Sequence, residues 1–173
     1  MKIYKTQIKG LLVVKQKNNI DKRGSLRETY NKKLLNKKFV FEYCTTSKKN
    51  ILRGFHFQTR FQQSKYVNVL KGKILDVVVD LRKNSQTFGK SFKIILSQKN
   101  ATSLFIPRGF AHAYFSYDAE NIIYYKLDNF YKPKFENGII FDDKQLKIKW
   151  PKKKAIISEK DKKLKSLKNF IKT

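Results

Sequence analysis

Two histidines are the scarcest chemically useful side chains in this sequence, and one of them lies in an unusual stretch. Residues 51–65 place His56 between Arg53 and Lys65, with Arg60 also close in the chain. The surrounding residues are aromatic and apolar, which is typical of a β-strand. A histidine held beside cationic groups on a rigid strand could act as a base next to an anionic ligand. The stretch therefore predicts a site of that kind.

Strand alternation decides which of these side chains share a face. By alternation His56 and Gln58 lie on one face of the strand, and Arg53 and Phe55 lie on the other. Gly54 offers an exception, because a glycine inside a strand often marks a bulge. A bulge at Gly54 would turn the side chain of Arg53 toward the face that carries His56.

Five further side chains are candidates, and each also has an ordinary structural explanation. His112 follows a turn and begins a predicted strand, although a lone histidine is more often a core residue with its hydrogen bonds satisfied. Tyr125 lies in a strand where side-chain packing alone would explain it. Asp76 and Asp80 share one apolar strand and could be structural hydrogen-bond acceptors. Asp161 could be the acidic residue of a helix cap.

The elements that must position these residues are mostly short strands. Apolar and β-branched runs recur at spacings of about 8–12 residues between turn residues, which favours an antiparallel sandwich or barrel. These runs are 11–14, 39–46, 51–58, 66–70, 74–80, 91–96, 102–106, 113–116 and 121–127. The glycine of Lys71-Gly72-Lys73 predicts a hairpin turn between two of them. The polar stretch 31–38 is consistent with a short helix.

The end of the chain has a different pattern. Ser158 and Asp161 form a capping-box pattern that opens a helix. Leu164, Leu167 and Ile171 then recur at helical spacing. We therefore expect one mainly β domain over 1–173, with a short C-terminal helix over about 158–171.

Composition limits the classes of function. The formal net charge is +27, which is typical of nucleic-acid-binding proteins, but the positive residues are nearly all lysines scattered from end to end. A lysine-rich surface would still attract anionic ligands. One cysteine excludes an internal disulfide framework, and no signal peptide or membrane-spanning run is recognisable. These features favour a cytoplasmic protein that binds neither nucleic acid nor membrane.

Several motifs stand together in one order along the chain. They are Arg53-Gly-Phe-His56-Phe-Gln58, Gln63-Ser-Lys65, Asp76-Val-Val-Val-Asp80-Leu-Arg82, Ser85-Gln-Thr87-Phe-Gly89, Ile106-Pro-Arg-Gly-Phe-Ala-His112, Tyr125-Lys126, Asp142-Asp143 and Ile148-Lys-Trp150-Pro151. With this set the chain closely resembles the dTDP-4-dehydrorhamnose 3,5-epimerases over about residues 3–165. The resemblance implies an antiparallel, cupin-like jelly-roll barrel, a homodimer, and catalysis without a metal or organic cofactor.

The resemblance also implies a reaction, which belongs to the biosynthesis of dTDP-L-rhamnose for cell-surface polysaccharides. The substrate, dTDP-4-dehydro-6-deoxy-D-glucose, has a C4 ketone that acidifies the protons on C3 and C5, and inversion at both gives dTDP-4-dehydro-L-rhamnose. Epimerisation needs a base on one face, a proton donor on the other and a positive group for the enolate oxygen. By resemblance His56 matches the base, Asp161 the acid that orients it, Tyr125 the donor and Lys65 the positive group.

Positions that contact the nucleotide sugar are implied in the same way. They are Arg23, Glu28, Arg53, His112, Tyr131, Glu136 and Lys160. Arg53 matches a position near the diphosphate, where a guanidinium group suits a bidentate contact. Tyr131 matches an aromatic residue that stacks on thymine.

Some positions depart from the pattern of the family. Phe41 and Tyr43 stand where glutamine and asparagine are usual beside the ligand. Ala113 replaces a glycine after the second histidine, and Arg108 replaces an acidic residue. These departures leave open a 3-epimerase, or a related isomerase that acts on another nucleotide-linked 4-keto-deoxyhexose.

Two other classes of protein also stay open. A metal-dependent cupin oxygenase would hold its ion with two histidines and a carboxylate. The segment that starts at His56 lacks the usual pair of histidines separated by one residue, which disfavours that class. A basic nucleic-acid-binding protein is the third class.

Overall fold

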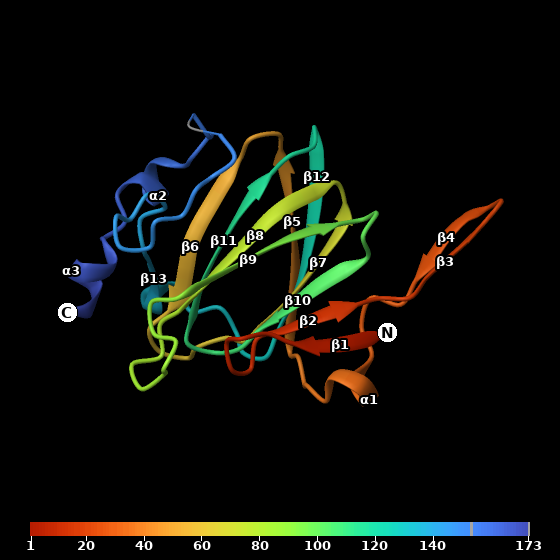
Figure 1. The fold of residues 1–173 in the computed structure, drawn as a ribbon, viewed down its shortest axis with the longest axis horizontal. Helices are drawn as coiled ribbons and strands as arrows, with labels where there is room; N and C mark the ends of the chain where they lie inside the picture. The colour runs from red at the N-terminus through yellow and green to blue at the C-terminus, as the bar shows by residue number, and fades with distance from the viewer. Residues whose placement is uncertain (153, 173) are drawn as a thin grey trace.

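Most strands pair in an antiparallel fashion into two facing sheets (Figure 1). In this computed structural model the described residues are 1–152 and 154–172. One sheet has the order β1 (Lys2–Lys5), β2 (Leu12–Lys15), β10 (Thr102–Ile106), β7 (Lys65–Lys71), β12 (Glu120–Leu127) and β5 (Phe41–Lys48). The other has the order β13 (Glu136–Gly138), β6 (Leu52–Gln58), β11 (Phe110–Ser116), β8 (Lys73–Asp80) and β9 (Ser91–Ser97). The prediction of a mainly β, antiparallel jelly-roll fold is confirmed; in the described part of the chain, hydrogen bonds define these two large sheets and a separate two-stranded sheet.

The main core lies between the two sheets. Val67 and Ile123 from the six-stranded sheet belong to the same buried cluster as Ile74 and Val78 from β8. The alternate residues of β8 point to the other side, where they join a second cluster with residues of the C-terminal segment. A strand that is buried on both faces needs a nearly continuous apolar sequence, which explains the run of valines in β8.

The two aspartates of β8 have different partners. Asp80 accepts hydrogen bonds from the side chains of Arg82, Ser85 and Thr87, so it holds the following loop in place. Burial would raise the pKa of Asp80, but these donors lower it to about 2. Asp80 is therefore accounted for as a structural hydrogen-bond acceptor. Asp76, in contrast, pairs with a histidine of the site described below.

The prediction of one continuous C-terminal helix is wrong. The tail contains two short helices, α2 (Glu159–Lys162) and α3 (Leu167–Ile171), and the hydroxyl groups of Ser158 and Ser166 cap their N-termini. Between them the backbone at Lys165 pairs with Ile139 beside the five-stranded sheet. The first helix ends where the backbone at Lys165 pairs with Ile139, and the cap at Ser166 then begins a second helix.

The N-terminal third contributes elements at the periphery. A tight turn after Asp21 joins β3 (Asn18–Asp21) to β4 (Gly24–Arg27). Figure 1 shows this hairpin projecting from the body of the molecule, on the side away from α2 and α3. The predicted short helix is also present as α1 (Lys32–Leu35). A 3-10 helix, η1 (Pro133–Phe135), precedes β13.

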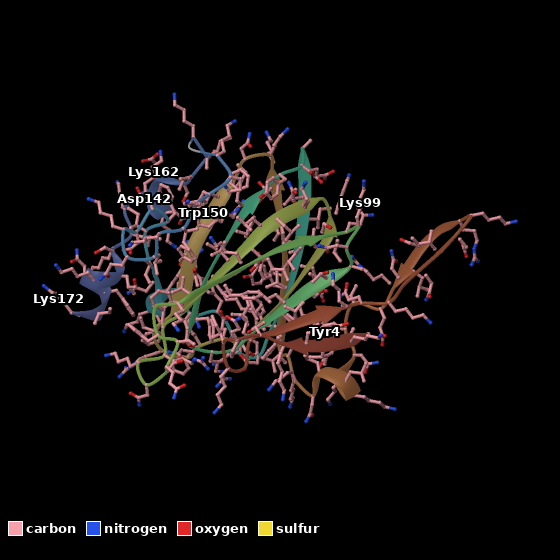
Figure 2. All side chains as sticks on the ribbon, in the orientation of Figure 1. Tyr4, Lys99, Asp142, Trp150, Lys162 and Lys172 are labelled. Carbon is pink, nitrogen blue, oxygen red and sulfur yellow. The ribbon has the colours of Figure 1, made fainter. Side chains whose placement is uncertain are left out.

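Lysines occupy well-separated parts of the surface. Figure 2 shows Lys99 on the side of the body that faces the projecting hairpin, and Lys162 and Lys172 at the opposite end. The side chains ending in nitrogen point outward around the whole outline of this view. Within the described residues, no helix has the length and apolar content needed to cross a membrane.

Candidate active site

A bulge in β6 brings Arg53 to the face of His56. His112 of β11 lies opposite His56 and Tyr114 lies opposite Arg53, so three steps along β6 match two steps along β11. The extra residue is accommodated at Gly54, whose φ is +107°. A Cβ atom there would lie 2.4 Å from the carbonyl oxygen of His112, which only glycine avoids. Arg53 and His56 consequently line the same cavity.

His56 and Asp161 form a hydrogen-bonded pair at this cavity. The imidazole Nε2 lies 2.8 Å from Asp161 Oδ1, and Asp161 Oδ2 accepts the Gly54 backbone N–H at 3.0 Å. Burial would raise the pKa of Asp161, but the hydrogen bonds from His56 and Gly54 lower it below its ordinary value. An ionised Asp161 requires the proton on Nε2 for this hydrogen bond, which leaves the Nδ1 lone pair of His56 free to accept a proton.

His112 has a similar partner of its own. Its Nε2 lies 2.8 Å from Asp76 Oδ2, and both side chains are buried. Because His112 and His56 are directly opposite each other on neighbouring strands, the two histidines line one cavity although 55 residues separate them. Among the described residues, no group of three or more His, Cys, Asp or Glu side chains is placed to hold a metal ion.

The six-stranded sheet supplies the opposite wall of the cavity. Lys65 begins β7 and Tyr125 lies on the neighbouring strand β12, and both line the cavity. Burial lowers the pKa of Lys65 to about 8, although the carboxylates of Asp76 and Glu136 favour its charged form. Burial raises the pKa of Tyr125 well above its ordinary value, so its phenol stays protonated at neutral pH. A proton acceptor and a proton donor therefore come from opposite sheets.

Glu136 organises a polar group at the edge of the cavity. The hydroxyl of Tyr131 donates to Glu136 Oε2 at 2.6 Å, and Lys160 Nζ donates to the same oxygen at 2.5 Å. Burial would raise the pKa of Glu136, but these two donors lower it. Helix α2 thus delivers two adjacent residues to the site, Lys160 to Glu136 and Asp161 to His56.

Most of the predicted site residues come together in this chain. Seven line the cavity directly: Arg53, His56, Lys65, His112, Tyr125, Tyr131 and Glu136. Asp161 and Lys160 lie behind them as hydrogen-bond partners. Arg23 and Glu28 do not join them. Arg23 is on the projecting hairpin, paired with Asp21 and highly exposed, and Glu28 follows the same hairpin and accepts a hydrogen bond from Asn31.

The sequence-based set missed other residues of the cavity. Thr45, Gln63 and Tyr114 also line it, and the Tyr114 hydroxyl lies 2.8 Å from Ser47 Oγ and 3.2 Å from Thr45 Oγ1. Strand alternation would have found Tyr114, because it is two residues beyond His112 and so shares its face.

The departures from the family pattern have different surroundings. Tyr43 lines the cavity, whereas Phe41 packs beside it against the core between the sheets. Ala113 is buried in the second core cluster and does not line the cavity. Arg108 binds Asp128 on the surface at 3.0 Å. Of the four, Tyr43 alone contributes to the cavity wall.

Comparisons with known proteins agree on one family. The family model described as dTDP-4-dehydrorhamnose 3,5-epimerase matches residues 5–169. The dTDP-4-dehydrorhamnose 3,5-epimerase of Methanothermobacter thermautotrophicus is 38% identical over 174 residues, which cover 96% of this chain and 94% of that protein.

Solved structures give the same result. The dTDP-4-dehydrorhamnose 3,5-epimerase of Bacillus anthracis, with TDP and PPi bound, is 36% identical with a TM-score of 0.92, covering 96% of this chain and 99% of that one. The dTDP-6-deoxy-D-glucose-3,5-epimerase of Legionella pneumophila, in complex with dTDP-4-keto-L-rhamnose, is 37% identical with a TM-score of 0.92, covering 96% and 93%.

Proposed function

This chain belongs to the dTDP-4-dehydrorhamnose 3,5-epimerase family, and from that premise we propose that it inverts C3 and C5 of dTDP-4-dehydro-6-deoxy-D-glucose. The product is dTDP-4-dehydro-L-rhamnose, and each inversion passes through an enolate without a cofactor. One observation supports this most strongly: His56 on one sheet, paired with Asp161 of α2, faces a tyrosine and a lysine from the other sheet across one cavity.

The proposed chemistry starts at His56. The C4 ketone of the substrate acidifies the protons on C3 and C5, and the free Nδ1 of His56 accepts one of them. The resulting imidazolium is stabilised by ionised Asp161. The electron pair of the broken C–H bond moves to the ketone oxygen, where Lys65 as an ammonium ion stabilises the negative charge.

Tyr125 completes the inversion. Its phenol comes from the opposite sheet and delivers a proton to the other face of the planar enolate. The raised pKa of Tyr125 keeps the phenol protonated before the reaction. After release of the product, His56 loses its extra proton and Tyr125 regains one by exchange with water, so the enzyme returns to its starting state.

The direct test is proton exchange in D₂O with purified protein and dTDP-4-dehydro-6-deoxy-D-glucose, followed by NMR. Deuterium at both C3 and C5 with inversion supports the 3,5-epimerase. Exchange at C3 alone supports the alternative of a 3-epimerase, for which the aromatic Tyr43 in the cavity wall is the specific observation. Absence of exchange with this and other nucleotide-linked 4-keto sugars contradicts the proposal.

Lys65→Ala is expected to slow enolate formation by about 10²–10³-fold, the typical loss for one contact that stabilises an oxyanion. Deuterium exchange at C3 measures this rate directly. Lys71→Ala is a matched control on the same strand, because Lys71 is exposed and pairs with Glu120 instead of facing the cavity. An exchange rate of Lys65→Ala equal to the wild-type rate would contradict the role of Lys65.

The ionisation of Lys65 should also make catalysis depend on pH. The depressed pKa of about 8 means that Lys65 is charged below that pH and neutral above it. We therefore expect kcat/KM, which reports ionisations of the free enzyme, to fall as pH rises through about 8. This alkaline limb should be absent from Lys65→Ala, and its persistence there would assign it to another group.

Arg53 is proposed to bind the diphosphate, supported by its exposed position in the same cavity wall as His56. Arg53→Ala is expected to weaken TDP binding by about tenfold or more, since hydrogen bonds to charged groups contribute about 1.5–3 kcal/mol. Turnover at saturating substrate should change less. Titration calorimetry measures the affinity, with the exposed Arg60→Ala as control. Unchanged affinity for TDP would refute this assignment.

We also propose that the protein is a homodimer that works in the cytoplasm. The β3–β4 hairpin projects from the body and leaves Ile20 76% and Leu26 69% exposed. Arg23 and Glu28, on and beside this hairpin, could contact substrate only in the cavity of a second copy. The exposed free thiol of Cys44 is suited to a reducing compartment. The mass in solution, measured by light scattering, tests the dimer.

A further inference from the structure

Tyr43 is the aromatic side chain that lies directly beside the proposed proton donor. In the pairing of β5 with β12, Tyr43 is opposite Tyr125, so the two side chains share the inner face of the sheet. Their ring centroids are 4.8 Å apart and the ring planes differ by 22°, which is a stacked arrangement. Both side chains line the cavity.

The stacked pair belongs to a longer row of rings. Phe41 contacts Tyr43 with centroids 5.8 Å apart, and Phe130 contacts Phe41 at 6.3 Å. At the other end, the ring of Tyr125 meets His112 edge to face at 6.1 Å. Phe41 therefore supports Tyr43 from one side, while Tyr43 covers one face of Tyr125.

These contacts limit how freely the Tyr125 ring can turn. Tyr125 is almost fully buried, with 3% of its surface exposed, and part of that burial comes from the face of Tyr43. A smaller side chain at position 43 would leave space on that face, and the Tyr125 ring could then occupy orientations that do not aim its hydroxyl at the substrate. The tyrosine at position 43, where the family usually has asparagine, thus affects the orientation of the Tyr125 hydroxyl as well as the shape of the cavity wall.

Resting on the proposed function, we propose that Tyr43 is a positioning residue whose stacked ring holds Tyr125 in the orientation that protonates the enolate. The enolate has two fates. Protonation by Tyr125 inverts the carbon, whereas return of a proton from His56 restores the original configuration. In D₂O the imidazolium proton of His56 can exchange with solvent before it returns, so the second fate gives deuterated substrate of the original configuration. The ratio of deuterated substrate to inverted product therefore measures how well Tyr125 is aimed.

Tyr43→Ala is expected to raise this ratio at C3 by about two- to tenfold, the range that corresponds to the loss of one aromatic pair. The rate of proton removal, which belongs to His56, should change less than the ratio. Tyr43→Phe keeps the ring and removes the hydroxyl, so it should restore the wild-type ratio. Tyr124→Ala is a matched control. Tyr124 lies next to Tyr125 but on the opposite face of β12, where its hydroxyl donates a hydrogen bond to Glu42.

The outcomes separate this inference from the proposed function. A wild-type protein that exchanges no deuterium contradicts the function itself. A wild-type protein that exchanges and inverts, together with an unchanged ratio in Tyr43→Ala, overturns the positioning role alone. A shifted ratio in Tyr43→Phe also overturns it, because it would assign the effect to the hydroxyl. If thermal unfolding shows that Tyr43→Ala is unfolded, Tyr43→Leu, whose side chain is less drastically reduced but has no planar ring to stack on Tyr125, must show a rise in the ratio.

Discussion

Replacing His56 by alanine is expected to reduce proton exchange at C3 to background, a loss of about 10²–10⁴-fold, the usual contribution of a positioned general base. His56 lines the cavity, and Asp161 holds its Nε2 at 2.8 Å, which leaves Nδ1 to accept a proton. Exchange of the C3 proton in D₂O, followed by NMR, measures the step that this residue is proposed to perform.

The nucleotide should still bind to His56→Ala, because Arg53 and the group around Glu136 remain in place. The affinity for TDP therefore serves as the internal control for a folded site. Exchange that continues at the wild-type rate would show that another residue is the base. His112 would be the first to examine, since it lies directly opposite on β11.

Tyr125→Phe should separate two events that coincide in the wild-type protein. Without the phenolic proton the enolate still forms at His56, so deuterium should enter C3 at a rate close to that of the wild-type protein. Inversion should fall by about 10²–10⁴-fold, because the opposite face of the enolate has lost its donor. The ring is kept, so the stacking on Tyr43 and the edge contact with His112 are preserved.

NMR of the reaction mixture in D₂O distinguishes deuterated starting material from inverted product and thus measures both events together. Tyr124→Phe is a suitable control, because it removes a hydroxyl from the neighbouring residue on the outer face of the same strand. A normal yield of inverted product from Tyr125→Phe would show that another group is the donor.

Much of the fold could be predicted from local patterns. The hairpin at Gly72, the strand at 121–127 and the turn before β4 follow from turn residues and alternating or continuous apolar runs, which act within a few residues. The prediction of a single C-terminal helix over about 158–171 was wrong. The apolar spacing of this segment is helical, but the pairing of Lys165 with Ile139 divides it, and such a contact between distant segments leaves no local signal.

The candidate site was predictable as a list of residues and not as an arrangement. The resemblance to one family identified seven residues that line the cavity. It did not reveal that Arg23 does not line the cavity of its own chain and lies on a hairpin that projects from the body. A motif records which residue types occur in which order, and it contains no information about whether they meet.

By itself the sequence determined the class of fold, the family, and the chemical types in the site: a histidine, a carboxylate, a phenol and an ammonium group. Tertiary structure alone decided three features that turn these types into a site. The extra residue at Gly54 aims Arg53 and His56 into one cavity, the pairing of β6 with β11 sets His56 opposite His112, and the pairing of β5 with β12 stacks Tyr43 on Tyr125. The physical reason is that strand register is fixed by hydrogen bonds and burial between segments distant in the chain, and a shift of one residue would turn every side chain to the other face.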